Sequence, residues 1–163
     1  MKRVAVYPGS FDPVTNGHLD IIRRACGIFS EVVVAVLHNR TKKALFSPEE
    51  RLALIKANLK GLKNVRVESF SGLLVDYMKK NDISVAIRGL RAVSDLEYEF
   101  QIAHTNRALY NKMETVFLMP SDKYVYLSSS MVREVASFGG KFGAYIPANV
   151  VRALARKNSE KEC

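Results

Sequence analysis

Residues 4–18 read Val4-Ala5-Val6-Tyr7-Pro8-Gly9-Ser10-Phe11-Asp12-Pro13-Val14-Thr15-Asn16-Gly17-His18, an apolar run that leads directly into a polar turn. The run predicts a buried strand, and the apolar spacing that follows it predicts a helix beginning near His18. A helix start offers unpaired backbone N–H groups and a partial positive charge, and glycines allow a phosphate to approach the backbone. The stretch therefore indicates an anion site, with an ordinary strand-to-helix turn as the alternative.

Apolar, β-branched runs recur along the chain and are separated by segments with the apolar spacing of helices. The predicted strands are residues 4–7, 32–37, 65–67, 85–87 and 115–119. This alternation predicts a doubly wound, Rossmann-like α/β fold, in which a five-stranded parallel sheet, mostly buried on both faces, carries helices on both sides. The ligand crevice is then expected at the carboxyl ends of the strands, where residues 7–18, 88–91 and 120–130 meet.

Several helix boundaries can be predicted from local signals. Ser47-Pro48-Glu49-Glu50 has the pattern of a capping box with proline at the first helical position, and Ser94-Asp95-Leu96-Glu97 repeats the box without proline. A helix over about residues 131–138 is expected to end at Gly139-Gly140, and a last helix is expected to begin near Pro147. The chain of 163 residues fits one domain, with residues 158–163 expected as a frayed tail.

The net charge of +9 predicts attraction to anions. The lysines and arginines are spread over many segments rather than forming a basic stripe with interleaved aromatics, so we expect no nucleic-acid partner. No apolar stretch approaches the roughly 18 residues of a membrane span, and no secretory signal precedes the first strand, so we expect a soluble, cytoplasmic protein without a membrane partner. Cys26 and Cys163 have neither metal-ligand spacing nor the pattern of a disulfide framework.

The sequence lacks the two commonest phosphate-binding motifs, because neither G-x-G-x-x-G after the first strand nor G-x-x-x-x-G-K-[ST] is present. The stretch from Tyr7 to His18, together with Leu127-Ser128-Ser129-Ser130, resembles the two signatures of the nucleotidylyltransferase superfamily. Thr15 stands where many members of that superfamily carry a histidine. The segment Ile87-Arg88-Gly89-Leu90-Arg91-Ala92-Val93-Ser94-Asp95-Leu96-Glu97-Tyr98-Glu99 resembles the bacterial phosphopantetheine adenylyltransferase family.

The resemblance implies an enzyme that transfers AMP from ATP to 4′-phosphopantetheine, giving dephospho-coenzyme A and pyrophosphate in coenzyme A biosynthesis. It also implies a homohexamer. The reaction calls for Mg²⁺, which we expect to bind mainly through phosphates and water with no protein metal ligand. Because coenzyme A shares its pantetheine and adenylate moieties with the product, we also expect feedback binding of coenzyme A. Such a reaction needs cationic side chains and N–H donors to align two polyanions, and needs no covalent intermediate. An enzyme with another acceptor, such as nicotinate mononucleotide or a cytidylyl acceptor, and a nucleic-acid-binding module remain as alternatives.

The resemblance also assigns roles to individual residues. The expected catalytic residues are His18, Lys42 and Arg91, with His18 stabilising the transition state at the α-phosphate. The expected ATP-binding residues are Ser10, Phe11, His18, Gly89, Leu90, Arg91, Glu99, Tyr124, Val125, Tyr126, Leu127, Ser128, Ser129 and Ser130. The expected acceptor-binding residues are Ser10, Lys42, Leu74 and Arg88.

Each of these residues has an ordinary structural alternative. His18 alone is consistent with a capping histidine, the serine run with helix caps, and Leu74 with a core leucine. Lys42 fits a solvated charge run, and Glu99 fits a helix-surface glutamate. The protonation state of His18 is left open, because its ordinary pKa of about 6.5 allows either form.

Overall fold

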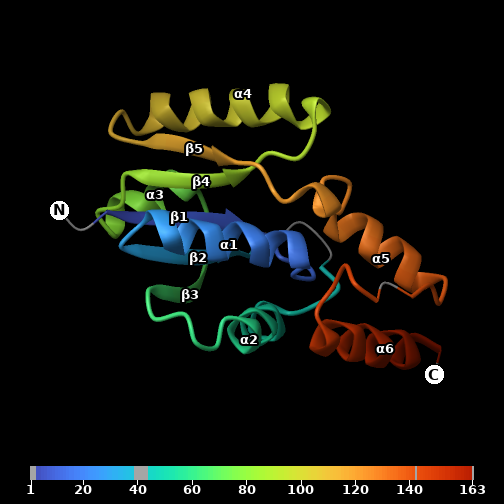
Figure 1. The fold of residues 1–163 in the computed structure, drawn as a ribbon. Helices are drawn as coiled ribbons and strands as arrows, with labels where there is room; N and C mark the ends of the chain where they lie inside the picture. Colours follow the sequence, from blue (N-terminus) through green and yellow to red (C-terminus); the bar gives the residue numbers. More distant parts are fainter. Residues whose placement is uncertain (1–2, 39–43, 142, 163) are drawn as a thin grey trace.

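The computed structural model describes residues 3–38, 44–141 and 143–162 (Figure 1). The strands are β1 (Val4–Gly9), β2 (Glu31–Leu37), β3 (Val65–Phe70), β4 (Val85–Gly89) and β5 (Glu114–Leu118). The helices are α1 (Asn16–Ile28), α2 (Pro48–Asn58), α3 (Leu74–Lys80), α4 (Val93–Leu109), α5 (Ser129–Ser137) and α6 (Ala148–Glu162), with a short 3₁₀ helix η1 (Asp122–Tyr124).

The five strands form one parallel sheet in the order β3-β2-β1-β4-β5. From β1 the chain adds β2 and β3 on one side of the sheet, and then crosses over to add β4 and β5 on the other side. The direction of strand addition therefore reverses between β1 and β4. Their carboxyl ends all point toward the end of the molecule where α5 lies (Figure 1). The predicted doubly wound fold is therefore confirmed, and its switch point lies between β1 and β4.

Alternate residues of the central strands supply two cores, one on each face of the sheet. On one face Ala5, Val32 and Val34 pack with apolar side chains of α1, α2, α5 and α6. On the other face Val6 and Val33 pack with side chains of α3. Because this alternation is the period of a strand, helices can cover both faces and leave the carboxyl edge open.

The expectation that the strands are mostly buried on both faces is correct for β1 and β2 and wrong for β3 and β5. β1 and β2 are buried through their central residues, whereas most residues of β3 and β5 are partly exposed. The reason is position in the sheet, since β3 and β5 are its two edges.

The capping box at Ser47 is confirmed. The Ser47 hydroxyl accepts from the Glu50 N–H at 3.2 Å, and the Glu50 carboxylate accepts from the Ser47 N–H at 2.7 Å. The capping box predicted at Ser94 is wrong, because α4 already begins at Val93 with Ala92 at its N-cap and without a side-chain cap.

α6 continues through Glu162, into the segment expected as a frayed tail. The Asn158 side chain donates to the Ala136 carbonyl at 2.6 Å and ties this helix to α5. Within the part of the chain that the structure describes, no helix is long and apolar enough to cross a membrane.

Candidate active site

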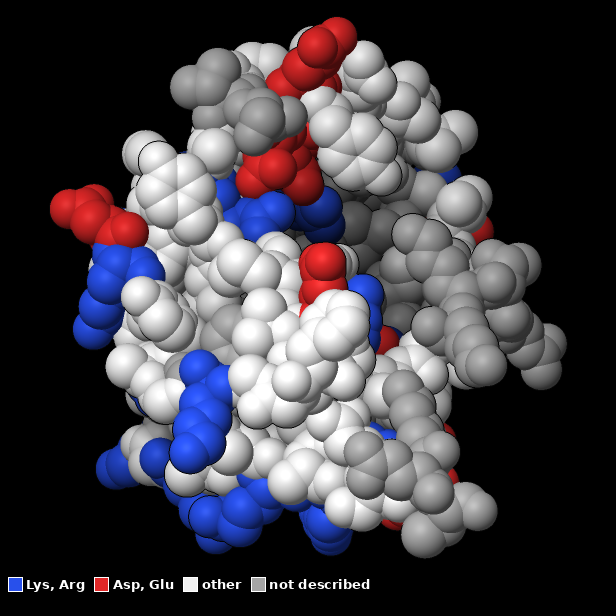
Figure 2. Space-filling view, turned by 90° about the vertical axis from the view of Figure 1, so that its right-hand side faces the viewer, with Lys and Arg blue, Asp and Glu red and all other residues white. Residues whose placement is uncertain are grey.

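A cavity of about 640 Å³ opens at the carboxyl ends of β1 and β4, at the switch point of the sheet. Its walls come from the turn after β1, the end of β4, the start of α5 and one face of α4. Figure 2 views this end of the molecule and shows Lys and Arg side chains beside the central hollow. The predicted meeting of residues 7–18, 88–91 and 120–130 is therefore confirmed.

Most of the predicted site residues line this cavity. They are Ser10, Phe11, His18, Leu74, Arg88, Gly89, Arg91, Tyr124, Leu127, Ser128, Ser129 and Ser130. Leu90, Glu99, Val125 and Tyr126 are not in its lining, and Tyr126 is 86% exposed. Lys42 lies outside the described residues.

Phe11 anchors the turn after β1. Its side chain is buried, its ring meets the rings of Tyr7 and His18 edge to face at 5.4 and 5.1 Å, and its φ of +47° is left-handed. A non-glycine residue keeps such a conformation only where its surroundings fix it, which is common at functional sites. A Cβ on Gly9 would lie 3.0 Å from two atoms of the Phe11 ring, so Gly9 makes room for a protein ring and not only for a ligand.

His18 is held at the third position of α1 by a reciprocal capping box with Thr15. Its Nδ1 lies 3.1 Å from the Thr15 N–H, which donates to it, and 3.0 Å from the Thr15 hydroxyl. Because Nδ1 accepts a hydrogen bond, the proton of the neutral ring resides on Nε2. Burial, reinforced by the positive charge of Arg91, lowers the pKa of His18 to about 4. His18 is therefore a cap and, at neutral pH, an uncharged N–H donor in the cavity wall.

Arg88 is the penultimate residue of β4 and is held by Glu99 of α4. The Arg88 Nε and Nη2 atoms donate to the two Glu99 carboxylate oxygens, both at 2.7 Å. Burial lowers the pKa of Arg88, but the hydrogen bonds and the charge of Glu99 outweigh it and raise the pKa overall. Glu99 is itself buried, so its place in the site is behind Arg88 rather than against a ligand.

Arg91 connects β4 to the segment before α5. Its Nε donates to Asp95 at 3.1 Å, and its Nη1 donates to the Leu127 carbonyl at 3.0 Å. Two guanidinium groups thus reach the carboxyl edge of the sheet from the same strand end, each oriented by a carboxylate of α4. Such fixed planar groups are suited to binding phosphate oxygens.

The serine run before α5 binds protein groups as well as lining the cavity. Ser128 is the N-cap of α5, and its hydroxyl accepts from the Met131 N–H at 3.1 Å. The Ser129 hydroxyl donates to the Pro13 carbonyl at 2.8 Å, which fastens the start of α5 to the turn after β1. The first turn of α5 therefore presents backbone N–H groups and its positive dipole end to the cavity.

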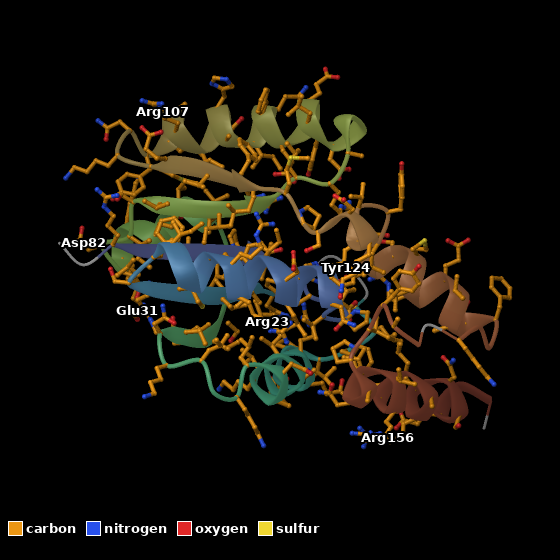
Figure 3. The ribbon with its side chains drawn as sticks, viewed as in Figure 1. Arg23, Glu31, Asp82, Arg107, Tyr124 and Arg156 are labelled. Atoms are coloured by element: carbon orange, nitrogen blue, oxygen red, sulfur yellow. The ribbon has the colours of Figure 1, made fainter. Side chains whose placement is uncertain are left out.

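Tyr124 lies where the first turn of α1 meets the segment before α5 (Figure 3). A Cβ on Gly17 would come within 3.3 Å of the Tyr124 Cβ, so Gly17 allows these two segments to approach. The Lys123 ammonium lies 4.9 Å from the centre of the Tyr124 ring. Lys123 itself is exposed and is not part of the cavity lining, so this contact supports the Tyr124 ring from outside the wall.

The structure adds lining residues that the sequence reasoning missed. They include Asp12, Arg51, Tyr98, Ile102, Asn106 and Arg133. Tyr98, Ile102 and Asn106 recur every four residues, a spacing that places them on one helix face and could have indicated a shared wall. The Asp12 carboxylate accepts from the N–H groups of Leu45 and Phe46, both at 2.9 Å, and no local sequence pattern indicates that pairing.

Comparison with known proteins adds independent findings. The family model described as cytidylyltransferase-like matches residues 6–135. A phosphopantetheine adenylyltransferase of Dictyoglomus turgidum is 58% identical over 153 residues, which cover 94% of this chain and 96% of the relative. Another, of Clostridium novyi, is 54% identical over 155 residues, which cover 95% of this chain and 96% of that protein.

Two solved structures share the fold at low sequence identity. A putative nicotinate-nucleotide adenylyltransferase from Vibrio parahaemolyticus superposes with a TM-score of 0.69 at 17% identity, covering 96% of this chain and 93% of its own. The second is a bifunctional NMN adenylyltransferase/ADP ribose pyrophosphatase from Francisella tularensis, complexed with AMP and a manganese ion. It superposes with a TM-score of 0.70 at 17% identity, and the match covers 96% of this chain and 49% of that protein. These two structures support the fold. The family model and the sequence relatives establish that the chain belongs to the phosphopantetheine adenylyltransferase family of cytidylyltransferase-like nucleotidyltransferases.

Proposed function

We propose that this chain transfers the adenylyl group of ATP to 4′-phosphopantetheine, releasing pyrophosphate and forming dephospho-coenzyme A. Family membership supports the reaction. The observation that carries the proposal is the convergence of neutral His18, Arg88, Arg91 and two helix starts on one cavity at the switch point. Those groups are the donors and cations that two polyanions require.

The chemical step is an in-line displacement at phosphorus. An oxygen of the acceptor phosphate forms a bond to the α-phosphorus of ATP, and the bond from that phosphorus to the bridging oxygen of the β-phosphate breaks. The electron pair of the broken bond leaves with pyrophosphate. His18 donates its Nε2–H to an α-phosphate oxygen and stabilises the charge that grows there without giving up its proton.

The remaining residues divide between the two substrates. Arg88, fixed by Glu99, binds the acceptor phosphate together with Ser10, while Leu74 contacts the pantetheine arm. Lys42, which lies outside the described residues, is proposed as a further ligand of that phosphate. The nucleotide is bound by lining residues of the cavity, with the α5 N-terminus toward the β- and γ-phosphates. They are Phe11, His18, Gly89, Arg91, Tyr124, Leu127, Ser128, Ser129 and Ser130.

Mg²⁺ is the divalent ion that we propose to accompany ATP. A structural neighbour was crystallised with AMP and manganese. In residues 3–38, 44–141 and 143–162, no group of three or more His, Cys, Asp or Glu side chains is arranged to hold a metal. The carboxylates nearest the cavity already bind Arg88, Arg91 and the N–H groups of residues 45 and 46. The residues therefore fit an ion bound by phosphate oxygens and water, which neutralises charge on the triphosphate.

The assembly and regulation of the enzyme are proposed from the same family likeness. We propose a cytoplasmic location from that likeness alone. A homohexamer would cover large side chains that α4 exposes, where Tyr98 is 63%, Phe100 46% and Leu109 49% exposed. Coenzyme A combines an adenylate with a pantetheine arm, so it would compete for the cavity that takes both substrates. Failure of coenzyme A to displace either substrate in an equilibrium binding assay would remove the regulatory proposal.

The acceptor is tested by competition. The protein is incubated with ATP, Mg²⁺ and equal concentrations of 4′-phosphopantetheine and nicotinate mononucleotide, and products are identified by mass spectrometry. We expect dephospho-coenzyme A, with turnover lowered by orders of magnitude in His18→Ala while ATP still binds. Preferential formation of a nicotinate dinucleotide would assign the chain to another acceptor.

A further inference from the structure

Arg51 joins three chain segments at one side of the cavity. It lies on α2, is 3% exposed and belongs to the cavity lining. Its Nη1 donates to the Ser10 carbonyl at 2.8 Å and to the Leu37 carbonyl at 3.2 Å, and its Nε donates to the Ser47 carbonyl at 3.4 Å. One guanidinium therefore binds the turn after β1, the end of β2 and the N-cap of α2.

The charge of Arg51 is compensated differently from that of the other arginines in the cavity. Arg88 pairs with Glu99, Arg91 with Asp95, and Arg133 with Asp12. Among the residues that the structure describes, no acidic side chain forms an ion pair with Arg51, and backbone carbonyls are its partners. The Glu49 carboxylate acts on Arg51 through its charge but accepts its hydrogen bond from the Ser47 hydroxyl. Since buried charges are normally paired directly, the charge of Arg51 can also act on an anion in the cavity.

The bond from Arg51 to Ser10 also sets the direction of the next N–H group. The peptide bond between Ser10 and Phe11 is trans, so its C=O and N–H point in opposite directions. When Arg51 fixes the Ser10 carbonyl, it therefore fixes the Phe11 N–H on the opposite side of the same plane. The left-handed φ of Phe11 is a conformation that needs such support.

We infer that Arg51 is a positioning residue for polyphosphate binding. It holds the peptide between Ser10 and Phe11 so that the Phe11 N–H donates to a phosphate of the nucleotide, and its own charge attracts the same polyanion across the cavity wall. This inference rests on the proposed function, because it takes a nucleoside triphosphate as the ligand. Arg51 lies on α2 and acts on the ligand indirectly, by holding the turn after β1 whose N–H group donates to the phosphate.

The test compares Arg51→Met and Arg51→Lys with Asn64→Ala. Methionine removes both the charge and the donors, whereas lysine keeps the charge and loses the planar fork. Asn64 is the matched control, since its side chain donates to the Cys26 and Phe29 carbonyls at 2.8 and 3.1 Å, just before β3 and outside the cavity lining. Calorimetry measures binding of ATP and of inorganic tripolyphosphate, and thermal unfolding reports folding.

We expect Arg51→Met to weaken binding of both probes about tenfold and to lower kcat/KM for ATP about 100-fold, the scale of a lost N–H donor. The affinity and kcat/KM of Arg51→Lys should lie between those of Arg51→Met and the wild type. Asn64→Ala should lower the Tm and leave the affinity for both probes unchanged. If Arg51→Met does not fold, the test rests on Arg51→Lys. Wild-type affinity and wild-type kinetics in Arg51→Lys would then contradict the inference.

The inference is overturned if the folded Arg51 variants bind tripolyphosphate as the wild type does and lose only thermal stability, as Asn64→Ala does. Its failure can be separated from failure of the proposed function. A wild type without acceptor-dependent turnover, whose Arg51 variants still bind tripolyphosphate more weakly, would reject the proposed reaction and support the role of Arg51.

Discussion

His18 is neutral in the folded protein, and we expect this neutrality to appear as a loss of stability in mild acid. Burial, followed by the charge of Arg91, lowers the pKa of His18 from 6.5 to about 4. In the unfolded chain the same ring takes a proton below pH 6.5, so acid favours unfolding. The stabilising contribution is complete above about pH 6.5 and is lost as the pH falls toward 4. The difference between the two pKa values lowers the free energy of unfolding by about 3 kcal/mol at most, in strong acid, and by about 2 kcal/mol at pH 5.

Urea unfolding at pH 8 and pH 5 measures this contribution when the wild type is compared with two variants. His18→Gln removes the titrating ring from the cavity, and His104→Gln removes an exposed histidine of α4 as the matched control. All other titrating groups are common to the three proteins. We expect the wild type and His104→Gln to lose about 2 kcal/mol more than His18→Gln between the two pH values.

Proton NMR of the ring checks the same reasoning without a variant. The His18 resonances should stay at their neutral positions until the pH approaches about 4. A midpoint at or above 6.5, with equal losses of stability in all three proteins, would refute both the neutral ring and the hydrogen-bond donor role derived from it.

Three smaller perturbations test individual contacts. Glu99→Gln leaves Arg88 without its charged partner, so the KM for the acceptor should rise and the unfolding free energy should fall by about 2 kcal/mol; an unchanged KM in steady-state kinetics would contradict this. Gly9→Ala places a Cβ against the Phe11 ring, and we expect kcat/KM to fall about tenfold or more in a protein that still folds, whereas wild-type kinetics would reject the tight packing. Ser47→Ala removes the N-cap of α2 and should cost about 1 kcal/mol in urea unfolding, with no measurable loss as the contrary result.

The fold could be predicted because its strands and helices are specified by local sequence signals and by the periodic spacing of apolar residues. β-branched runs such as residues 32–37 and the capping box at Ser47 each specify an element without reference to distant residues. Burial of the strands could not be predicted equally well, since it depends on place in the sheet. The same kind of apolar run is buried in β2 and half-exposed in the edge strand β5.

The site follows the same division. Because ligands bind at the switch point of a parallel sheet, the turn after β1, the end of β4 and the serine run could be expected to lie together. The partners that orient the functional groups come from elsewhere in the chain, as with Arg51 on Ser10 or Asp12 on Phe46. The neutral state of His18 depends on burial and on the nearby Arg91, which sequence spacing does not reveal.

The most direct test of the account is acceptor-dependent cleavage of ATP. Pyrophosphate release is measured with ATP and Mg²⁺, with and without 4′-phosphopantetheine, and the second product is weighed by mass spectrometry. We expect pyrophosphate and dephospho-coenzyme A in equal amounts, only when the acceptor is present. Pyrophosphate release that ignores the acceptor, or no release by protein that binds ATP, would contradict it.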